Sequence, residues 1–333
     1  MSNSVSNAYF SRENVLSMVP LFILVALVIT LSLLSDEFLR LATFINLMLQ
    51  VAPIGIIAIG AMLCIIIGGI DFTSGQGLAT IGMASAFFYT FGFFSGNVPL
   101  FILSFVMFGA VLGLTNGFLI ARLNILPFIA TLAMMSLLAG LSLYINRGGM
   151  ILLVHSPILG VGQGRVGGII PVPFIVFLGV CVIVSIILKH TKLGVYIYAI
   201  GGNEIALWYT GVKVRSYKIL VYMIAGMCTG IASLLTISTI AMATPGMGGT
   251  VLIDAIAAAC IGGTSMRGGK GTVIGTFIGA VIIVLINTAF IYLNIQSAMQ
   301  NVFKGLVILF AVSVDAISNI KFSKLKTYGR SSI

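Results

Sequence analysis

Charged residues are scarce in this chain of 333 residues: they make up 7% of it, and only seven are Asp or Glu. A soluble domain normally carries about 25% charged residues to solvate its surface. Because 59% of this chain is hydrophobic, it has too few charged side chains to keep a folded core in water. The composition therefore excludes a soluble globular protein and indicates a protein surrounded by lipid.

Cysteine and histidine are also sparse. The cysteines all lie within apolar runs at spacings that fit neither a metal site nor a disulfide framework: Cys64, Cys181, Cys228 and Cys260. We expect them to be small core residues. The two histidines, His155 and His190, have no carboxylate or cysteine at ligand spacing. The chain has no G-x4-G-K-[ST] loop, so we expect no metal, nucleotide or other cofactor on it.

Long apolar runs are what the sequence does have. Continuous runs of about twenty residues are typical of membrane-spanning helices, whereas barrel strands alternate apolar and polar residues. The sequence therefore predicts an all-α polytopic membrane protein with about ten transmembrane helices. The predicted spans cover residues 16–34, 44–69, 72–93, 98–121, 127–146, 172–188, 219–242, 252–264, 272–295 and 300–318. The segment 252–264 is short for a bilayer, and we expect a half-helix there.

The basic residues, which give a formal charge of +10, test this topology. Lys and Arg concentrate in cytoplasmic segments of membrane proteins. With the N-terminus inside, the cytoplasmic segments hold Arg12, Arg122, Lys189, Lys192, Lys213, Arg215, Lys218, Arg267, Lys270, Lys321, Lys324, Lys326 and Arg330. The outside loops hold only Arg40, Arg147 and Arg165, and Lys304 falls inside the last span. We therefore predict both termini in the cytoplasm, with a tail at 1–15, a transmembrane domain at 16–318 and a basic tail at 319–333.

The longest cytoplasmic loop, residues 189–218, contains the polar stretch "YAIGGNEIALWYTGVKVR". Asn203 is placed to cap a short helix that ends at Gly211, a natural left-handed C-cap. Glu204 in the first turn suits the helix dipole. The helix also carries apolar side chains, Ile205, Leu207 and Trp208. We expect these side chains to lie on the bilayer surface or against a partner protein.

Two glycine-rich stretches, "GGIDFTSGQG" at 68–77 and "GGTSMRGGKG" at 262–271, share the pattern GG-x5-G-x-G. Glycine lets helices approach closely or lets the backbone break near a substrate path. A second similarity pairs "TNGFLIARLNI" with "INTAFIYLNI", which aligns Asn116 with Asn287 in the register of an inverted five-plus-five repeat. The glycine match does not fit that register. We predict pathway or gating residues in and around these motifs: Gly68, Gly69, Asp71, Asn116, Asp254, Gly262 and Gly263.

Asp71 and Asp254 are the acids nearest the hydrocarbon region, where a carboxylate is costly and marks a functional site. Asp71 has an alternative role as a cap whose carboxylate accepts from the amides of residues 73–75. A pair of carboxylates also fits an intramembrane aspartyl protease. Such a protease would have a GxGD motif at one aspartate and a tyrosine beside the other, but this chain has Gly-Gly-Ile-Asp at Asp71 and Ile253 before Asp254. In a further alternative, one of the two acids couples an ion gradient in a stand-alone carrier.

Five motifs in order point to one family: "GGIDFTSG", "NGFLIARLNILPFIATLAMMS", "YAIGGNEIALWYTGV", "LIDAIAAACIGGTSMRGGKGTVIGT" and "VFKGLVILFAV". Over residues 44–318 the chain resembles the permease subunits of bacterial ribose/xylose/arabinose-type ATP-binding-cassette (ABC) importers. The resemblance implies a multi-pass protein of the bacterial inner membrane that forms the pathway for a monosaccharide or related sugar and is not itself an enzyme. Branched-chain amino acid permeases have similar glycine motifs, and the "GGNE" segment favours the sugar branch.

The resemblance also implies partners. The loop helix would be the coupling helix that docks on a separate ATPase subunit, where ATP is used, through Gly201, Gly202, Asn203, Glu204, Ala206 and Gly211. A second permease chain, identical or different, would complete the pathway. An extracytoplasmic sugar-binding protein would contact the outside loops around 147–170 and 243–250. The chain departs from the family pattern at Ile205, Trp208, Ala139 and Arg267, and these departures concern ATPase docking and the choice of permease partner.

Overall fold

The computed structural model describes residues 20–33, 35, 37–94, 96–296, 298–306 and 309. The predicted tails 1–15 and 319–333, and most of the last predicted span, lie outside the described residues. A helix at Pro20–Leu33 and another at 298–306 flank the labelled elements. In chain order these are α2 Leu41–Ile66, α3 Ser74–Thr90, α4 Val98–Ala121, α5 Pro127–Ile145, β1 Ile151–Leu152, α6 Leu159–Gln163, β2 Arg165–Val166, β3 Ile170–Pro171, α7 Val172–His190, α8 Lys192–Tyr209, α9 Val214–Ile240, β4 Met242–Ala243, α10 Val251–Ile261 and α11 Val273–Tyr292.

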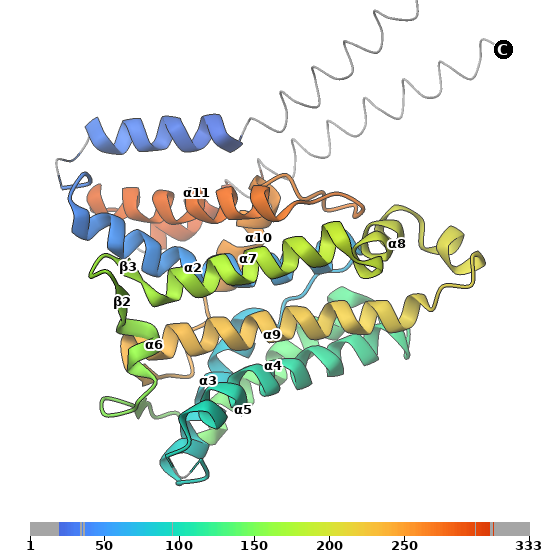
Figure 1. The fold of residues 1–333 in the computed structure, drawn as a ribbon, viewed down its shortest axis with the longest axis horizontal. Coiled ribbons are helices and arrows are strands. Elements are labelled where there is room, and N and C mark those ends of the chain that lie inside the picture. The colour runs from blue at the N-terminus through green and yellow to red at the C-terminus, as the bar shows by residue number, and fades with distance from the viewer. Residues whose placement is uncertain are drawn as a thin grey trace, which may run out of the picture.

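The long helices run side by side along one axis, with α2, α4, α7, α9 and α11 all roughly aligned (Figure 1). Apolar runs form helices here because a helix satisfies its own backbone groups, which lipid cannot do. Within the described residues, six helices are long and apolar enough to cross a membrane: α2, α4, α5, α7, α9 and α11. The prediction of a helical polytopic membrane protein is confirmed.

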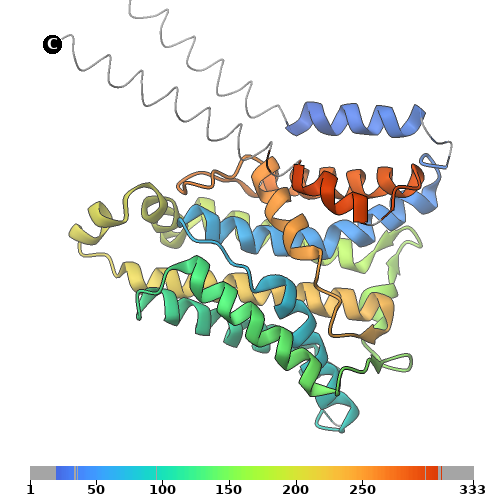
Figure 2. The same ribbon diagram turned by 180° about the vertical axis from the view of Figure 1, so that it is seen from behind.

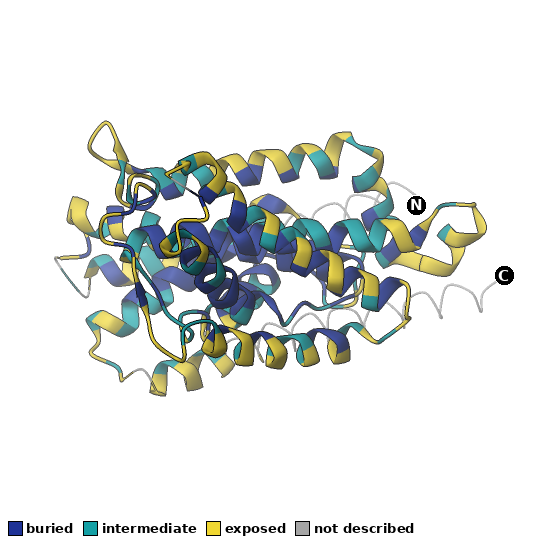
Figure 3. Cartoon of the chain, turned by 90° about the horizontal axis from the view of Figure 1, so that it is seen from below, coloured by how far each residue is buried: buried dark blue, intermediate teal, exposed yellow. Residues whose placement is uncertain are grey.

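Small residues let helices α4 and α9 pack closely against each other. A Cβ atom added to Gly113 would lie 2.1 Å from the carbonyl oxygen of Tyr222, and one added to Gly109 would lie 2.2 Å from that of Gly226. Glycines four residues apart let two backbones approach in this way. Figure 3 shows the result, with buried residues along the middle of the bundle and exposed residues on its outer faces.

Two helices, α3 and α10, begin inside the bundle rather than at its ends (Figure 2). The chain leaves α2 at one end, turns back as a non-helical segment over residues 67–73, and starts α3 part-way along. From the opposite end, residues 244–250 run inward to the start of α10. The predicted half-helix near 252–264 is therefore present as the 11 residues of α10. The predicted span 72–93 is shorter than expected, since α3 has 17 residues and residues 70–73 are not helical.

Short strands join the loops at one end of the bundle. β1 pairs with β4, which brings Ile151 opposite Ala243, and β2 pairs with β3 in a hairpin before α7. The two loops in which the sequence predicted contacts for a binding protein, around 147–170 and 243–250, therefore lie next to each other.

Candidate functional site

The polar segment after α7 contains the predicted capped helix. Helix α8 is interrupted at Asn203, whose backbone is non-helical (φ −160°, ψ 95°). The Asn203 side chain accepts a hydrogen bond from the backbone N–H of Ala206 at 3.0 Å, as an N-cap does. Past the last turn, Gly211 takes the left-handed conformation with φ 81°. The caps predicted at both ends of this helix are confirmed.

This capped turn, residues 204–209, projects two of its large apolar side chains, Ile205 and Trp208, away from the bundle. The side chains of Ile205 and Trp208 are 68% and 62% exposed. Leu207 differs from the expectation, because it is partly buried against the main core. Glu204 forms an ion pair with Lys218 of α9, with 2.6 Å between Nζ and Oε2. The turn therefore presents two large apolar groups outward and is held to α9 by an ion pair.

The base of the projecting turn rests on a junction of glycines. A Cβ atom added to Gly201 would lie 1.7 Å from the carbonyl oxygen of Ile66, the last residue of α2. That oxygen accepts a hydrogen bond from the N–H of Gly269, at 2.8 Å. By contrast, a Cβ on Gly202 would meet no described atom within 4 Å. The base of the projecting turn thus contacts the end of α2 and the second glycine motif at Gly201.

Tyr198 ties the same segment to the second glycine motif. Its hydroxyl donates to the carbonyl oxygen of Gly271 at 2.8 Å. Burial raises the pKa of Tyr198, which keeps the hydroxyl protonated and able to donate.

Helices α2 and α10 end in the same way. The residues after them, Gly68 and Gly263, have φ angles of 79° and 87°. The N–H groups of the following residues, Gly69 and Thr264, each donate to the carbonyl oxygen five residues earlier, at 2.9 and 3.0 Å. These hydrogen bonds define a Schellman motif at the end of each helix. The glycines at 68 and 263 are required by backbone conformation. Gly262 has another role, because a Cβ there would lie 2.3 Å from the carbonyl oxygen of Gly275 in α11.

Asp71 lies buried just before α3 and is held by nearby donors. Its Oδ1 accepts from the backbone N–H of Thr73 at 2.9 Å and from the Thr73 hydroxyl. Asn116 of α4 in turn donates from Nδ2 to that hydroxyl oxygen at 2.9 Å. Of the predicted amides of residues 73–75, Asp71 accepts from that of Thr73, which is itself the N-cap residue of α3, so Asp71 lies before the cap and does not form it. The structure joins the two predicted site residues Asp71 and Asn116 through Thr73.

Asp254 lies buried in the first turn of α10 and has a cation as partner. Lys304 Nζ is 3.0 Å from its Oδ1, and the two side chains are only 10% and 5% exposed. Asn287 of α11 donates to Oδ2 at 3.3 Å. Sequence analysis did not predict Lys304 as a site residue. A basic residue inside a predicted membrane span was a signal that could have identified it, because such a charge needs a partner. Asp71 and Asp254 have separate partners, which does not fit a proton shared by two carboxylates.

The starts of α3 and α10 meet inside the bundle. A Cβ atom on Gly75 would lie 2.7 Å from the carbonyl oxygen of Gly248, and one on Gly248 would lie 1.7 Å from that of Gly75. Both helices thus direct their N-terminal ends, with unpaired N–H groups and positive dipole ends, toward the same interior region.

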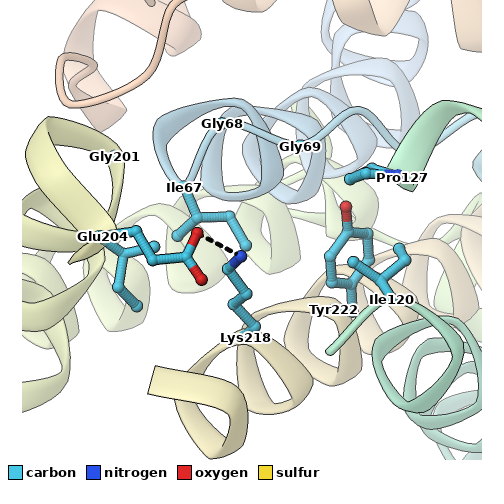
Figure 4. A pocket seen from close by; sticks show the side chains of 10 residues that line it. Ile67, Gly68, Gly69, Ile120, Pro127, Gly201, Glu204, Lys218 and Tyr222 are labelled. Carbon is cyan, nitrogen blue, oxygen red and sulfur yellow. Dashed lines mark hydrogen bonds and ion pairs between the residues drawn. The ribbon is translucent and has the colours of Figure 1, made fainter. Parts of the chain in front are cut away.

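A pocket of about 270 Å³ opens beside the projecting turn (Figure 4). Glu204 and Lys218 lie on one side of it and Tyr222 on the other, with the backbone of Gly68 and Gly69 running between them. Four of the predicted site residues, Gly68, Gly69, Gly201 and Glu204, therefore line one pocket.

Among the described residues no group of three or more His, Cys, Asp and Glu side chains could hold a metal ion. His155 and His190 are exposed, and three of the four cysteines, Cys64, Cys181 and Cys228, are buried.

Helices broken inside a bundle, with their N-termini directed inward, are typical of membrane transport proteins. The family model for the permease component of branched-chain amino acid transport systems matches residues 43–312. The chain is 37% identical to the ribose import permease of Haemophilus influenzae over 323 residues, which cover 95% of this chain and 97% of that protein. It is 34% identical to the ribose import permease of Escherichia coli (92% and 96% covered) and 33% identical to the galactose/methyl galactoside import permease of H. influenzae (87% and 90% covered). No solved structure matches. The chain belongs to this family of multi-pass transport permeases.

Proposed function

We propose that the chain is the permease subunit of an ATP-driven importer and forms the pathway for a monosaccharide. The observation that carries this proposal is the projecting turn 204–209, which exposes Ile205 and Trp208 and is fixed to the helix bundle at its base. Such a turn needs a partner surface, and an ATPase subunit supplies one. The relatives named for import of ribose and galactose favour a sugar over a branched-chain amino acid as cargo.

In the proposed topology ten helices cross the bacterial inner membrane and both termini are cytoplasmic. The segments that we assign to the cytoplasm meet at one end of the bundle, where Gly201 contacts Ile66 and Gly269. The loops given to the outside meet at the other end through β1 and β4. The inverted repeat is supported by the two inward-directed half-helices and by Asn116 and Asn287, each of which belongs to the network of one buried acid.

ATP is used on a separate ATPase subunit, and this chain carries no cofactor of its own. The residues proposed to dock or to shape the docking turn are Gly201, Gly202, Asn203, Glu204, Ala206 and Gly211. Movement of the ATPase subunits would displace the turn, and the contact between Gly201 and the end of α2 would pass that displacement to the segment 67–73. There lie Gly68, Gly69 and Asp71, which we propose as gating residues together with Asn116, Asp254, Gly262 and Gly263.

A second permease chain and an extracytoplasmic sugar-binding protein complete the proposed assembly. The paired loops around β1 and β4 offer the binding protein one continuous surface. Mass spectrometry of the chains that co-purify with the tagged permease in mild detergent would identify these partners and tell a homodimer from a heterodimer.

The substitution Glu204→Lys tests the docking role. We expect it to abolish uptake of radiolabelled D-ribose, D-galactose and D-allose by intact cells while the permease stays at its normal level in the membrane. The reason is that it reverses the charge on a turn that docks on the ATPase subunit.

A matched control separates docking from the ion pair. Lys218→Met breaks the same ion pair from the side of α9 and leaves the charge of the turn unchanged. We expect Lys218→Met to lower uptake far less than Glu204→Lys does. Normal uptake by Glu204→Lys would contradict docking through this turn.

A further inference from the structure

The pocket beside the projecting turn has the size and position of a ligand site. It lies at the end of the bundle that we assign to the cytoplasm, between the turn and the start of the segment 67–73. Its volume of about 270 Å³ is far larger than the roughly 10–15 Å³ that a single water needs. The pocket is therefore large enough for a small polar ligand together with some water.

One polar group at the wall of this pocket has no partner. The hydroxyl of Tyr222 makes no hydrogen bond within the described part of the chain, and the residue is only 1% exposed. A buried hydroxyl without a hydrogen-bond partner destabilises a fold, so the presence of this one calls for an explanation. In Figure 4 the hydroxyl points toward Gly69 and Pro127. A Cβ atom added to Gly69 would lie 2.2 Å from it, so Gly69 covers the hydroxyl in this state.

The opposite side of the pocket carries a carboxylate and an ammonium group. Glu204 can accept hydrogen bonds and Lys218 can donate them, while a tyrosine hydroxyl does both. Sugar hydroxyl groups also donate and accept, so a monosaccharide could be bound by this set without carrying a charge. The backbone of Gly68 and Gly69 adds no bulk between the two polar sides.

We propose that this pocket is an inner sugar site, occupied by the monosaccharide as it leaves toward the cytoplasm. The Tyr222 hydroxyl bonds a hydroxyl group of the sugar after the segment 67–70 shifts and uncovers it, and Glu204 and Lys218 bond the sugar from the other side. The inner site rests on the proposed function, because it assumes a sugar cargo and a cytoplasmic position for α8. It assigns Tyr222 a role in handling the sugar.

The substitution Tyr222→Phe tests the inner site in the complete importer. Uptake of D-ribose, D-galactose and D-allose is measured in cells that lack other importers for them. Because one hydrogen bond to the sugar is lost, we expect the initial rate for the imported sugar to fall about fivefold at an unchanged level of permease in the membrane. Tyr292→Phe is the matched control, since that hydroxyl lies 3.2 Å from the Thr43 hydroxyl at the other end of the bundle. It should keep the wild-type rate.

A second pair of variants separates sugar binding from packing. Gly69→Ala places a methyl group against the Tyr222 hydroxyl and should reduce the amount of permease in the membrane or its rate. Adding Tyr222→Phe removes the oxygen and makes room for the methyl group. The inner site predicts that the double variant regains a normal membrane level but keeps the slow uptake of Tyr222→Phe. If the double variant imports at the wild-type rate, the contact is packing alone and the inner site is overturned.

The outcomes also distinguish the two proposals. Equal uptake by the wild type and Tyr222→Phe overturns the inner site and leaves the proposed function standing. A wild-type importer that takes up none of the three sugars overturns the proposed sugar cargo, and the inner site with it.

Discussion

The starts of α3 and α10 are two versions of one arrangement within the same bundle. Each helix begins inside the protein, each has a buried acid near its first turn, and each acid belongs to a network that includes an asparagine of a neighbouring long helix. They differ in what balances the acid. Asp71 is held by hydrogen bonds from Thr73, two residues away, whereas Asp254 is held by the ammonium group of Lys304, 50 residues further along the chain.

The difference indicates different freedom of movement. The network around Asp71 is centred on its own segment, and other helices hold residues 67–73 through neutral groups, with Asn116 bonded to Thr73 and Thr131 of α5 bonded to the carbonyl oxygen of Ile70. Asp254 is joined by a buried ion pair to the helix at 298–306, and separating two buried charges is costly. We therefore expect α10 to stay fixed to its neighbours while the segment before α3 moves during transport.

The largest expected effect comes from breaking the ion pair. Lys304→Met leaves the buried carboxylate of Asp254 without its cation, which should lower the free energy of unfolding by about 3–5 kcal/mol. Thermal unfolding of the purified permease in detergent, together with its level in the membrane, would measure this loss.

Two further variants test whether the pairing itself causes that loss. Asp254→Asn combined with Lys304→Met removes both charges and should recover a large part of the stability. Lys270→Met removes an exposed cation and should change little. A single Lys304→Met variant as stable as the wild type would show that the ion pair does not anchor α10.

The contact between the two helix starts gives the next prediction. Gly248→Ala places a Cβ atom 1.7 Å from the carbonyl oxygen of Gly75, and because both partners are backbone, the starts of α3 and α10 must separate. Overpacking of this kind costs about 1–3 kcal/mol. We expect a lower melting temperature and reduced sugar uptake. Gly246→Ala, two residues earlier, meets no described atom within 4 Å and should behave as the wild type. Equal stability of the two variants would contradict a close contact at Gly75.

Features that depend on short stretches of sequence could be predicted. The apolar runs gave the positions of the long helices, and Asn203 and Gly211 gave both ends of the projecting turn, because caps act within a few residues. The short length of α10 was expected because the predicted span 252–264 is short for a bilayer.

Contacts between distant segments could not be predicted in the same way. The pairing of Lys304 with Asp254, the contact of Gly201 with the end of α2, and the approach of Gly75 to Gly248 depend on how the helices pack. Hydrophobic patterns do not specify that packing, because nearly every face of these helices is apolar. The inward turn of Leu207 has the same origin.

The smallest expected effect is that of Asp71→Asn. The asparagine keeps an oxygen that can accept from the N–H and hydroxyl of Thr73, and no described cation loses a partner. We expect a change of about 1 kcal/mol in the free energy of unfolding, whereas Asp254→Asn, its matched counterpart, leaves Lys304 unpaired and should cost about 3–5 kcal/mol.

Measurements of sugar uptake then separate the two possible roles of Asp71. Slow uptake at a normal membrane level would place its charge in the pathway, and uptake that falls only in proportion to the membrane level would make its role structural. If Asp71→Asn destabilised the permease as much as Asp254→Asn does, the contrast between the two helix starts would be wrong.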